Sequence, residues 1–303
     1  MGKPAAQPKL KVRYNKREVL TAILFLLPTM IILIGFSYYP AFEAIKGSFY
    51  KWDGFNEPKW RGISNYVKLF NDPVFLISLK NVFKWSLGSV FISLVAPLIG
   101  ALLIFNLKSK RAQYWYRVIF VLPMVVPAIV TIQIWTFIYE PTIGLLNTLL
   151  KSLHADFLVH NWLGESALVI PSLIFIGFPW ISGLNLLIYY AGLQDISTDV
   201  LEYAELDGCV GWNRVFKIEL PLILGQVKLL LILALVGTLQ NVTIPLLMTN
   251  GGPGYDSYVP GLYMYFQAFR LGNYGMANTI ATVMFVVIMT LTIISSRMKS
   301  KLS

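Results

Sequence analysis

The chain has very little of the chemistry that builds disulfide frameworks or metal centres. A single cysteine, Cys209, excludes an internal disulfide and a cysteine-based metal cluster. The two histidines, His154 and His160, have no cysteine nearby and few acids, so we expect no metal site. Charged residues make up 13% of the 303 residues, about half the share found in soluble domains. A soluble globular protein is therefore excluded.

Several catalytic motifs are also absent from the sequence. There is no G-x-x-x-x-G-K-[ST] phosphate-binding loop, which excludes an ATPase of that class. There is no His-Glu-x-x-His, no Gly-x-Ser-x-Gly and no pair of aspartates within an apolar run, which argues against an intramembrane enzyme. We therefore expect a chain that is not itself an enzyme.

Long apolar runs are what the sequence does have, since aliphatic, aromatic and sulfur-containing residues make up 56% of it. A bilayer core needs about 20 apolar residues in a helix, and backbone groups in lipid must bond within their own segment. The sequence therefore predicts an all-α integral membrane protein with six transmembrane helices. Their expected ranges are 19–39, 82–107, 117–139, 166–193, 222–248 and 276–296. Prolines that are expected to kink these helices are Pro28, Pro97, Pro123, Pro127, Pro171, Pro179 and Pro245.

Lysine and arginine residues set the expected orientation. They gather in a basic tail at 1–18, in the segment 108–117 and after residue 296, whereas 140–165 and 249–275 have one basic residue each. We therefore expect both termini to lie in the cytoplasm. The net charge of +10 flanks apolar runs, so it indicates topology, and no nucleic acid partner is expected.

The most unusual stretch is the acidic loop, residues 194–221, between the fourth and fifth apolar runs. It holds six of the fifteen acids in the chain: Asp195, Asp199, Glu202, Glu205, Asp207 and Glu219. Such a loop suits docking of a partner in the cytoplasm, and a merely solvated amphipathic loop is the alternative.

Local signals in the acidic loop predict a helix–turn–helix. Ser197, Thr198 and Asp199 are residue types that cap helices, and a glutamate follows Asp199 at capping-box spacing. We expect helices over about 199–206 and 211–219. Gly208 suits the turn between them, and Pro221 suits the first turn of the next span.

The acidic loop resembles the cytoplasmic loop of ABC-importer permeases, which reads Glu-Ala-Ala, then Asp-Gly, then Ile-x-Leu-Pro. The matching positions in this sequence are Glu202, Ala204, Asp207, Gly208, Phe216, Ile218, Leu220 and Pro221. Tyr203 departs from the pattern, because it stands where the first alanine is expected. A second stretch, Met-Thr-Asn-Gly-Gly-Pro-Gly at 248–254, is similar to the carbohydrate-uptake branch, which includes maltose and glycerol-3-phosphate permeases.

The resemblance implies the transmembrane domain of a type I ABC importer, formed by residues 19–303, in a bacterial cell membrane. It implies a sister permease, two ATPase subunits, and an extracellular or lipid-anchored solute-binding protein that meets the outer segments 52–60 and 251–274. ATP and Mg²⁺ are then bound by the ATPase, and this chain has no cofactor. The loop is implied to enter a cleft on the ATPase, with Glu202 as its charged contact and Gly208 as its turn.

Polar residues inside the apolar runs are neutral, which indicates the kind of ligand that the path accepts. Amides beside aromatic rings suit an uncharged, polyhydroxylated molecule. The candidate substrate-binding residues are Gln240, Asn241, Asn185, Gly183, Trp180, Gln133 and Thr243. Any single amide also suits a helix–helix hydrogen bond. The pair Gln240–Asn241 is favoured because the resemblance places this stretch at the cavity.

The leading interpretation is thus a transmembrane permease subunit of an ATP-driven, binding-protein-dependent importer of a sugar or oligosaccharide. An ion-coupled secondary transporter is the alternative. The apolar runs lack the carboxylates that ion coupling requires, which favours the importer.

Overall fold

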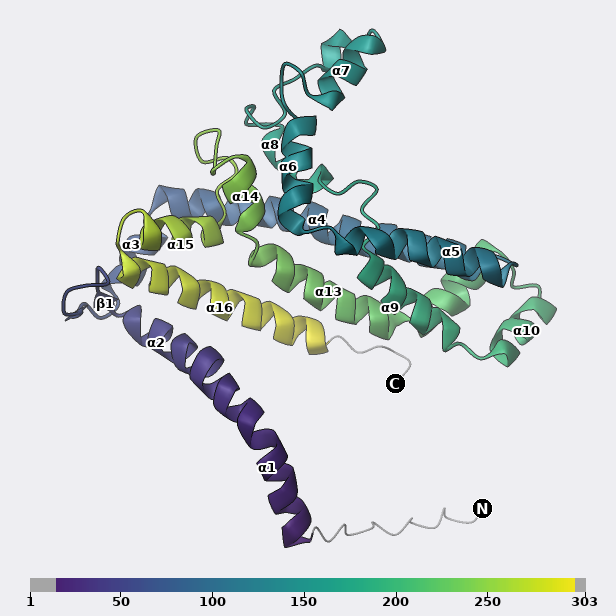
Figure 1. Ribbon diagram of the computed structural model, residues 1–303, viewed down its shortest axis with the longest axis horizontal. Helices are drawn as coiled ribbons and strands as arrows, with labels where there is room; N and C mark the ends of the chain where they lie inside the picture. Colours follow the sequence, from purple (N-terminus) through teal and green to yellow (C-terminus); the bar gives the residue numbers. More distant parts are fainter. Residues whose placement is uncertain (1–14, 298–303) are drawn as a thin grey trace.

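The computed structural model describes residues 15–297, which are mostly helical (Figure 1). The elements of the first half are α1 (Lys16–Leu33), η1 (Ile34–Tyr38, a π-helix), α2 (Tyr39–Gly47), β1 (Tyr50–Lys51), β2 (Lys59–Trp60), α3 (Ser64–Phe70), α4 (Pro73–Phe105), α5 (Lys110–Val121), η2 (Leu122–Val125, a 3₁₀-helix), α6 (Ala128–Ile138) and α7 (Leu145–Ser152). Those of the second half are η3 (Asp156–Leu158), α8 (Val169–Phe175), α9 (Gly183–Gln194), α10 (Thr198–Leu206), α11 (Trp212–Arg214), η4 (Val215–Glu219, a π-helix), α12 (Leu220–Leu222), α13 (Leu224–Leu239), α14 (Thr243–Met248), α15 (Pro260–Phe269) and α16 (Tyr274–Arg297).

The predicted all-α membrane fold is confirmed, with β1 and β2 forming one short antiparallel pair. Within the described residues, four helical segments are long and apolar enough to cross a membrane: Lys16–Gly47, Pro73–Phe105, Leu224–Met248 and Tyr274–Arg297. Residues 1–14 of the expected basic tail and residues 298–303 lie outside the described range. The expected spans at 117–139 and 166–193 are not continuous helices, and proline explains both interruptions.

The third expected span bends sharply in its middle. The segments Lys110–Val125 and Ala128–Ile138 meet at 89°, and they make one further span only if the bent pair is taken together. Pro127 disfavours helical backbone at Val126, which is extended with ψ 125°. The helix therefore ends at η2 and restarts as α6 in a new direction (Figure 1).

The fourth expected span divides into α8 and α9, joined by the non-helical link 176–182. Pro179 lies in this link after a cis peptide bond, and Gly177 and Trp180 have φ values of 82° and 60°. Proline has no backbone N–H to donate, so the helix ends before it. Ser182 then caps α9, because its side chain accepts a hydrogen bond from the Asn185 N–H at 3.5 Å.

Helix α4 is the central helix and packs against α8, α9, α13 and α15. It begins at Pro73, nine residues before the expected start at 82, because Asp72 caps it by accepting from the Val74 N–H at 2.8 Å. One core cluster lies around Trp85, and the other lies around Ala101. The same helix therefore connects the two cores of the molecule.

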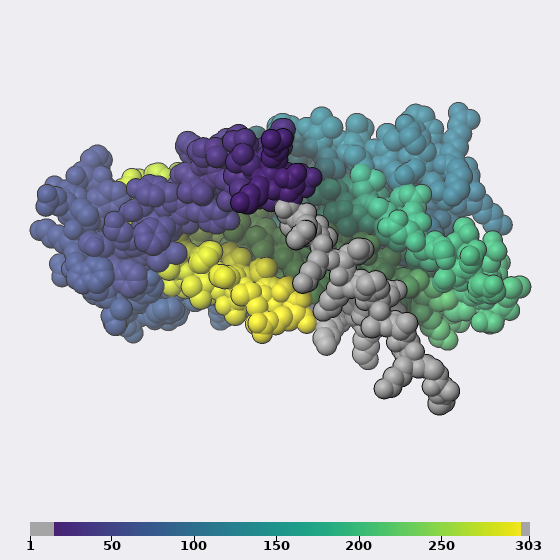
Figure 2. All heavy atoms as spheres, turned by 90° about the horizontal axis from the view of Figure 1, so that it is seen from below, coloured from purple at the N-terminus to yellow at the C-terminus, as the bar shows by residue number. Residues whose placement is uncertain are grey.

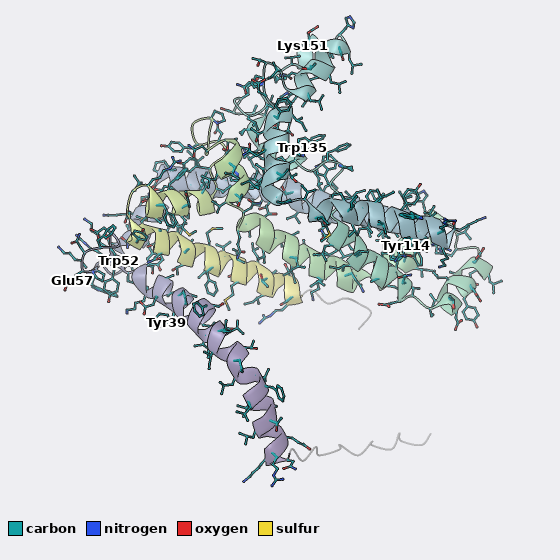
Figure 3. All side chains as sticks on the ribbon, in the orientation of Figure 1. Tyr39, Trp52, Glu57, Tyr114, Trp135 and Lys151 are labelled. Atoms are coloured by element: carbon teal, nitrogen blue, oxygen red, sulfur yellow. The ribbon has the colours of Figure 1, made fainter. Side chains whose placement is uncertain are left out.

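The first apolar segment stands apart from this body. None of the apolar window within Lys16–Gly47 is buried. Figure 1 shows α1 projecting away from the other helices, and in Figure 2, which is seen from below, α1 lies in front of them. Helix α2 packs against α16. Aromatic residues Trp52 and Tyr114 lie toward opposite ends of the long helices (Figure 3), as expected for side chains at the two membrane interfaces.

Candidate functional site

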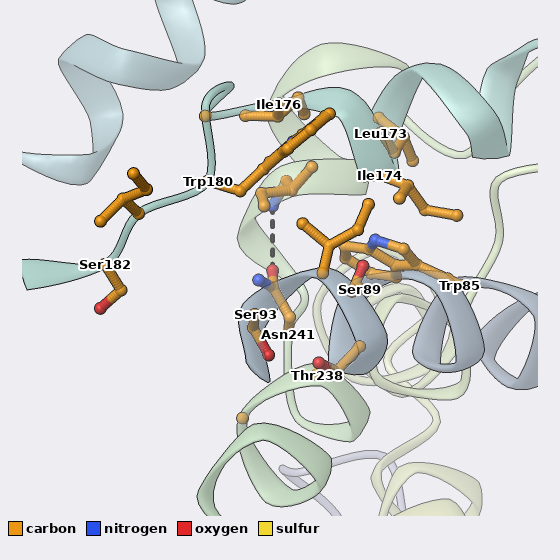
Figure 4. A pocket seen from close by; sticks show the side chains of 15 residues that line it. Trp85, Ser89, Ser93, Leu173, Ile174, Ile176, Trp180, Ser182, Thr238 and Asn241 are labelled. Atoms are coloured by element: carbon orange, nitrogen blue, oxygen red, sulfur yellow. Dashed lines mark hydrogen bonds between the residues drawn. The ribbon is translucent and has the colours of Figure 1, made fainter. Parts of the chain in front are cut away.

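The central cavity lies between α4, the link 176–182, α13 and α14, and has a volume of about 370 Å³ (Figure 4). Its lining residues are Trp85, Ser89, Ile92, Ser93, Leu173, Ile174, Ile176, Gly177, Trp180, Ile181, Ser182, Gly237, Thr238, Asn241 and Ile244. Two non-helical links contribute to it, namely 176–182 between α8 and α9 and 240–242 between α13 and α14. These links therefore place both backbone and side chains in the lining.

Hydroxyl groups on α4 form one wall of the central cavity. Trp85, Ser89 and Ser93 recur every four residues, so they share one face of the helix. The Ser93 hydroxyl donates to the Val90 carbonyl at 3.0 Å, and its lone pairs remain available to a ligand. Thr238 adds a further hydroxyl from α13. Gly177 and Gly237 also line the cavity.

Asn241 supplies the only amide side chain of this lining. Its Oδ1 accepts from the Ile244 N–H at 3.2 Å, which fixes the side chain at the break between α13 and α14 (Figure 4). The side-chain NH₂ donates to no residue within 15–297. It is therefore the one amide donor that the cavity offers to a ligand.

Trp180 presents an aromatic surface to the central cavity (Figure 4). Its Nε1 donates to the Phe175 carbonyl at 3.1 Å, and its ring packs edge-on against Phe175 and Phe178, with 4.9 Å between centroids in each case. Trp85 is 3% exposed and lines another part of the wall. Aromatic rings of this kind pack against the C–H face of a sugar ring.

Of the predicted substrate-binding residues, the structure brings Trp180 and Asn241 together in the cavity. Asn185 lies beside it, and its Nδ2 donates to the Ser93 carbonyl at 3.0 Å, so it joins α9 to α4. Gly183 packs against α5, because an added Cβ would lie 2.8 Å from the Cα of Val121. These two residues shape the cavity in this conformation without lining it.

The other three predicted residues lie elsewhere. Gln240 lines a separate pocket of about 270 Å³ beside Met284 and Phe285 of α16. Gln133 and Thr243 are exposed and do not line the central cavity. The assignment of all seven to substrate binding stays a prediction, and the geometry favours Trp180 and Asn241.

Sequence reasoning missed the hydroxyl residues Ser89, Ser93 and Thr238. Serines four residues apart within an apolar span are a signal that could have found the first two, because they share one helix face. None of the cavity-lining residues is ionisable, and the described residues contain no group of His, Cys, Asp or Glu able to hold a metal ion. The cavity lining is therefore electrically neutral, with hydroxyl groups and one amide among mostly apolar residues.

The acidic loop lies at the opposite end of the long helices from β1 and α3 (Figure 1). Helix α10 is capped by Ser197, whose Oγ accepts from the Val200 N–H at 3.4 Å. The expected capping box of Asp199 and Glu202 is therefore wrong, since Asp199 already lies in the first turn. Gly208, with φ 70°, ends the helix as expected.

The second helical part of the acidic loop, 212–222, has two faces. Trp212 and Phe216 are 70% and 63% exposed, and their rings stack with 6.0 Å between centroids. Val215 and Glu219 are buried on the opposite side, where Val215 joins the core around Ala101. One face of this helix thus holds it to the membrane body, and the other is free to contact a partner.

The structure places the predicted partner-contacting residues in three settings. Those that are exposed are Glu202, Asp207, Gly208 and Phe216, those that are partly buried are Ile218, Leu220 and Pro221, and Ala204 is buried. Tyr203 and Leu206 are also 69% and 83% exposed, and sequence reasoning did not assign them. The exposed surface of the loop is therefore more apolar than its six acids indicate.

Comparisons with known proteins agree with this architecture. The family described as binding-protein-dependent transport system inner membrane component matches residues 93–301. A probable ABC transporter permease protein, YurN of Bacillus subtilis, is 33% identical and covers 90% of this chain and 94% of its own length. The multiple sugar-binding transport system permease protein MsmF of Streptococcus mutans is 26% identical, over 91% of this chain and 94% of that protein.

A solved structure has the same fold. It is a bacterial alginate ABC transporter in complex with an alginate pentasaccharide-bound periplasmic protein, and one of its chains matches with a TM-score of 0.81 at 24% identity. The match covers 94% of this chain and 96% of the other. The chain therefore belongs to the family of binding-protein-dependent transport system inner membrane components, the permeases of ABC transporters.

Proposed function

We propose that the chain is a transmembrane permease subunit of an ATP-driven importer of a neutral sugar or oligosaccharide. The central cavity carries the proposal, because it combines hydroxyls, one free amide donor and two tryptophans with no ionisable group in its lining. Sugar hydroxyls both donate and accept hydrogen bonds, so serine, threonine and asparagine suit them. The aromatic surfaces suit the apolar face of the sugar ring.

The lack of ionisable residues in the cavity lining distinguishes this proposal from two others. An ion-coupled secondary transporter requires a carboxylate or an equivalent in its path, and the cavity lining has none. The alginate importer is described as carrying an acidic polysaccharide, and a matching path would need cations that this lining does not have. The name of MsmF, a multiple sugar-binding transport system permease protein, supports a sugar as the substrate.

The energy source in this proposal is a separate pair of ATPase subunits, which bind ATP and Mg²⁺. The rings of Trp212 and Phe216 and the side chain of Glu202 are all exposed on the acidic loop, which suits contact with a cleft on the ATPase. A sister permease completes the path. A solute-binding protein docks at the other end, where the β1–β2 hairpin lies, and the periplasmic protein named with the alginate importer supports such a partner.

In this proposal the chain crosses a bacterial cell membrane several times with both termini in the cytoplasm. Helix α16 ends toward the same side as the acidic loop, and the hairpin lies at the other end (Figure 1), which supports this orientation. The basic segment 108–117 and Arg297 then lie inside, in agreement with the distribution of lysine and arginine.

Reconstitution tests the proposal. The chain is purified with its sister permease and ATPase, placed in liposomes, and supplied with the binding protein and a panel of ¹⁴C-labelled glucose, maltose, raffinose and digalacturonate. We expect ATP-dependent accumulation of one or more neutral sugars and none of the uronate. Uptake that persists without the ATPase, or that follows an ion gradient, would reject the importer. Preferential uptake of the uronate would reject the neutral class.

A further inference from the structure

Glu219 is the one acid of the acidic loop that the protein buries completely, with 0% of its surface exposed. Its Oε1 lies 2.9 Å from the Nε of Arg214, which is 22% exposed. A buried carboxylate without a cation is strongly disfavoured, so the pair holds both side chains in place. The other oxygen, Oε2, has no hydrogen-bond partner among residues 15–297.

Arg214 has a second partner outside the acidic loop. Its Nη2 donates to Oδ1 of Asn106, the residue that ends α4. The Nδ2 of Asn106 in turn donates to the Leu102 carbonyl at 2.9 Å, within the last turn of α4. A continuous polar chain therefore runs from the buried face of the acidic loop to the C-terminus of the central helix.

These contacts join the helical segment 212–219 of the acidic loop to α4, the helix that lines the central cavity. Trp212 and Phe216, which face the ATPase in the proposed function, lie on the opposite side of the same helical segment. Farther from the C-terminus of α4, Ser89 and Ser93 of the same helix line the central cavity. By contrast, α10 has a single buried residue, Ala204. The segment 212–219 is thus attached to the membrane body more firmly than α10.

We propose that Arg214, Glu219 and Asn106 form a linkage that transmits movement of the acidic loop to α4, and through α4 to the cavity. The three are positioning residues, since none of them contacts substrate or ATP. The inference rests on the proposed function, because it assigns the coupling route within it. A guanidinium suits this position because its planar fork binds two acceptors in fixed directions, whereas an ammonium is a single point of charge.

Arg214→Lys, Glu219→Gln and Asn106→Ala are the test variants. The matched control is Glu43→Gln, which breaks a carboxylate–ammonium pair that is exposed on both sides, Glu43 with Lys46 at 3.4 Å. Each variant is purified as the complete complex with sister permease and ATPase. Two rates are measured in proteoliposomes, namely uptake of the labelled sugar that the wild-type importer accumulates best and ATP hydrolysis.

The ratio of sugar uptake to ATP hydrolysed is the deciding quantity. We expect it to fall about fivefold or more in each test variant, the lower end of typical coupling effects, and to stay at the wild-type value in Glu43→Gln. The double variant Asn106→Ala/Glu219→Gln should lose no more than the stronger single variant, because both break one linkage. Uptake and hydrolysis that fall together, at a constant ratio, would show a merely structural role and overturn the inference.

Failure of the proposed function gives a different result. If the wild-type complex does not couple uptake to hydrolysis, the proposed function itself fails. If Phe216→Ala uncouples the two rates while Arg214→Lys and Glu219→Gln assemble and keep the wild-type ratio, the importer stands and the linkage is rejected. If a test variant fails to assemble, Arg214→Lys, which retains the charge, and the Asn106 variant still decide the question.

Discussion

Asn241 and Gln240 are neighbours with the same functional group, and the structure separates them. Asn241 lines the central cavity with a free amide donor, whereas Gln240 lines a pocket beside α16. Replacing Asn241 with aspartate keeps the acceptor that bonds the Ile244 N–H and removes the donor. The lost bond to sugar is worth about 1 kcal/mol, or about fivefold in rate, and the added charge increases the loss. We expect at least that reduction.

The assay is initial uptake into proteoliposomes with saturating binding protein, so that delivery of sugar is constant. Asn241→Ala serves as a second variant that carries no charge, and we expect a loss of about fivefold or more because it removes the same donor. Gln240→Glu and Gln240→Ala are the matched controls, and both should transport at nearly the wild-type rate. An equal loss at both positions, or a larger loss at Gln240, would refute the assignment of this cavity to the sugar path.

Three further predictions concern other parts of the chain. Phe216→Ala should weaken binding of the ATPase about tenfold, measured with purified subunits, because truncating a central aromatic contact typically costs more than 1 kcal/mol. Gly183→Ala should destabilise the purified complex by about 1–3 kcal/mol, seen as a lower Tm, since its Cβ would meet Val121 at 2.8 Å; an unchanged Tm would contradict the packing role. Hydrogen bonds from Asn56 and then from nearby backbone lower the pKa of Asp53 to about 2, so the hairpin turn should keep its amide protection from neutral pH to about pH 4 and lose it as the pH falls through 2, measured by hydrogen exchange.

The apolar runs predicted the four long membrane helices, because hydropathy depends on local composition alone, but two further expected spans, 117–139 and 166–193, are broken. Proline positions did not predict which helices break. Helix α1 continues through Pro28 and α4 continues through Pro97, whereas backbone breaks occur beside Pro127 and Pro179. Pro97 is buried among neighbouring helices, which can supply partners for the carbonyl that a proline leaves free. Those partners depend on tertiary packing, which a single sequence does not reveal.

Candidate cavity residues were predicted by residue type, which identifies the chemistry of a side chain but not the direction in which it points. Asn185 and Asn241 are equally good candidates on that basis. In the structure, Asn185 makes a helix–helix hydrogen bond with the Ser93 carbonyl, and Asn241 lines the cavity. At the start of α4, by contrast, the sequence held a local signal that the prediction did not use. Asp72 followed by Pro73 is a local signal for a helix start, and the expected range 82–107 did not take it into account.

In the acidic loop, composition predicted a surface for a partner, but burial decides which of the acids belong to it. Six acids indicated a surface for a partner, and the structure divides them: the five at 195–207 are exposed, while Glu219 is buried with Arg214. Arg214 and Glu219 are five residues apart, which is not the three- or four-residue spacing of charge pairs on an α-helix, so the sequence did not predict their contact. The packing of Val215 into the core around Ala101 fixes which side of the segment faces inward. Because that same packing turns Phe216 outward, attachment to α4 and exposure toward a partner follow from one helix orientation.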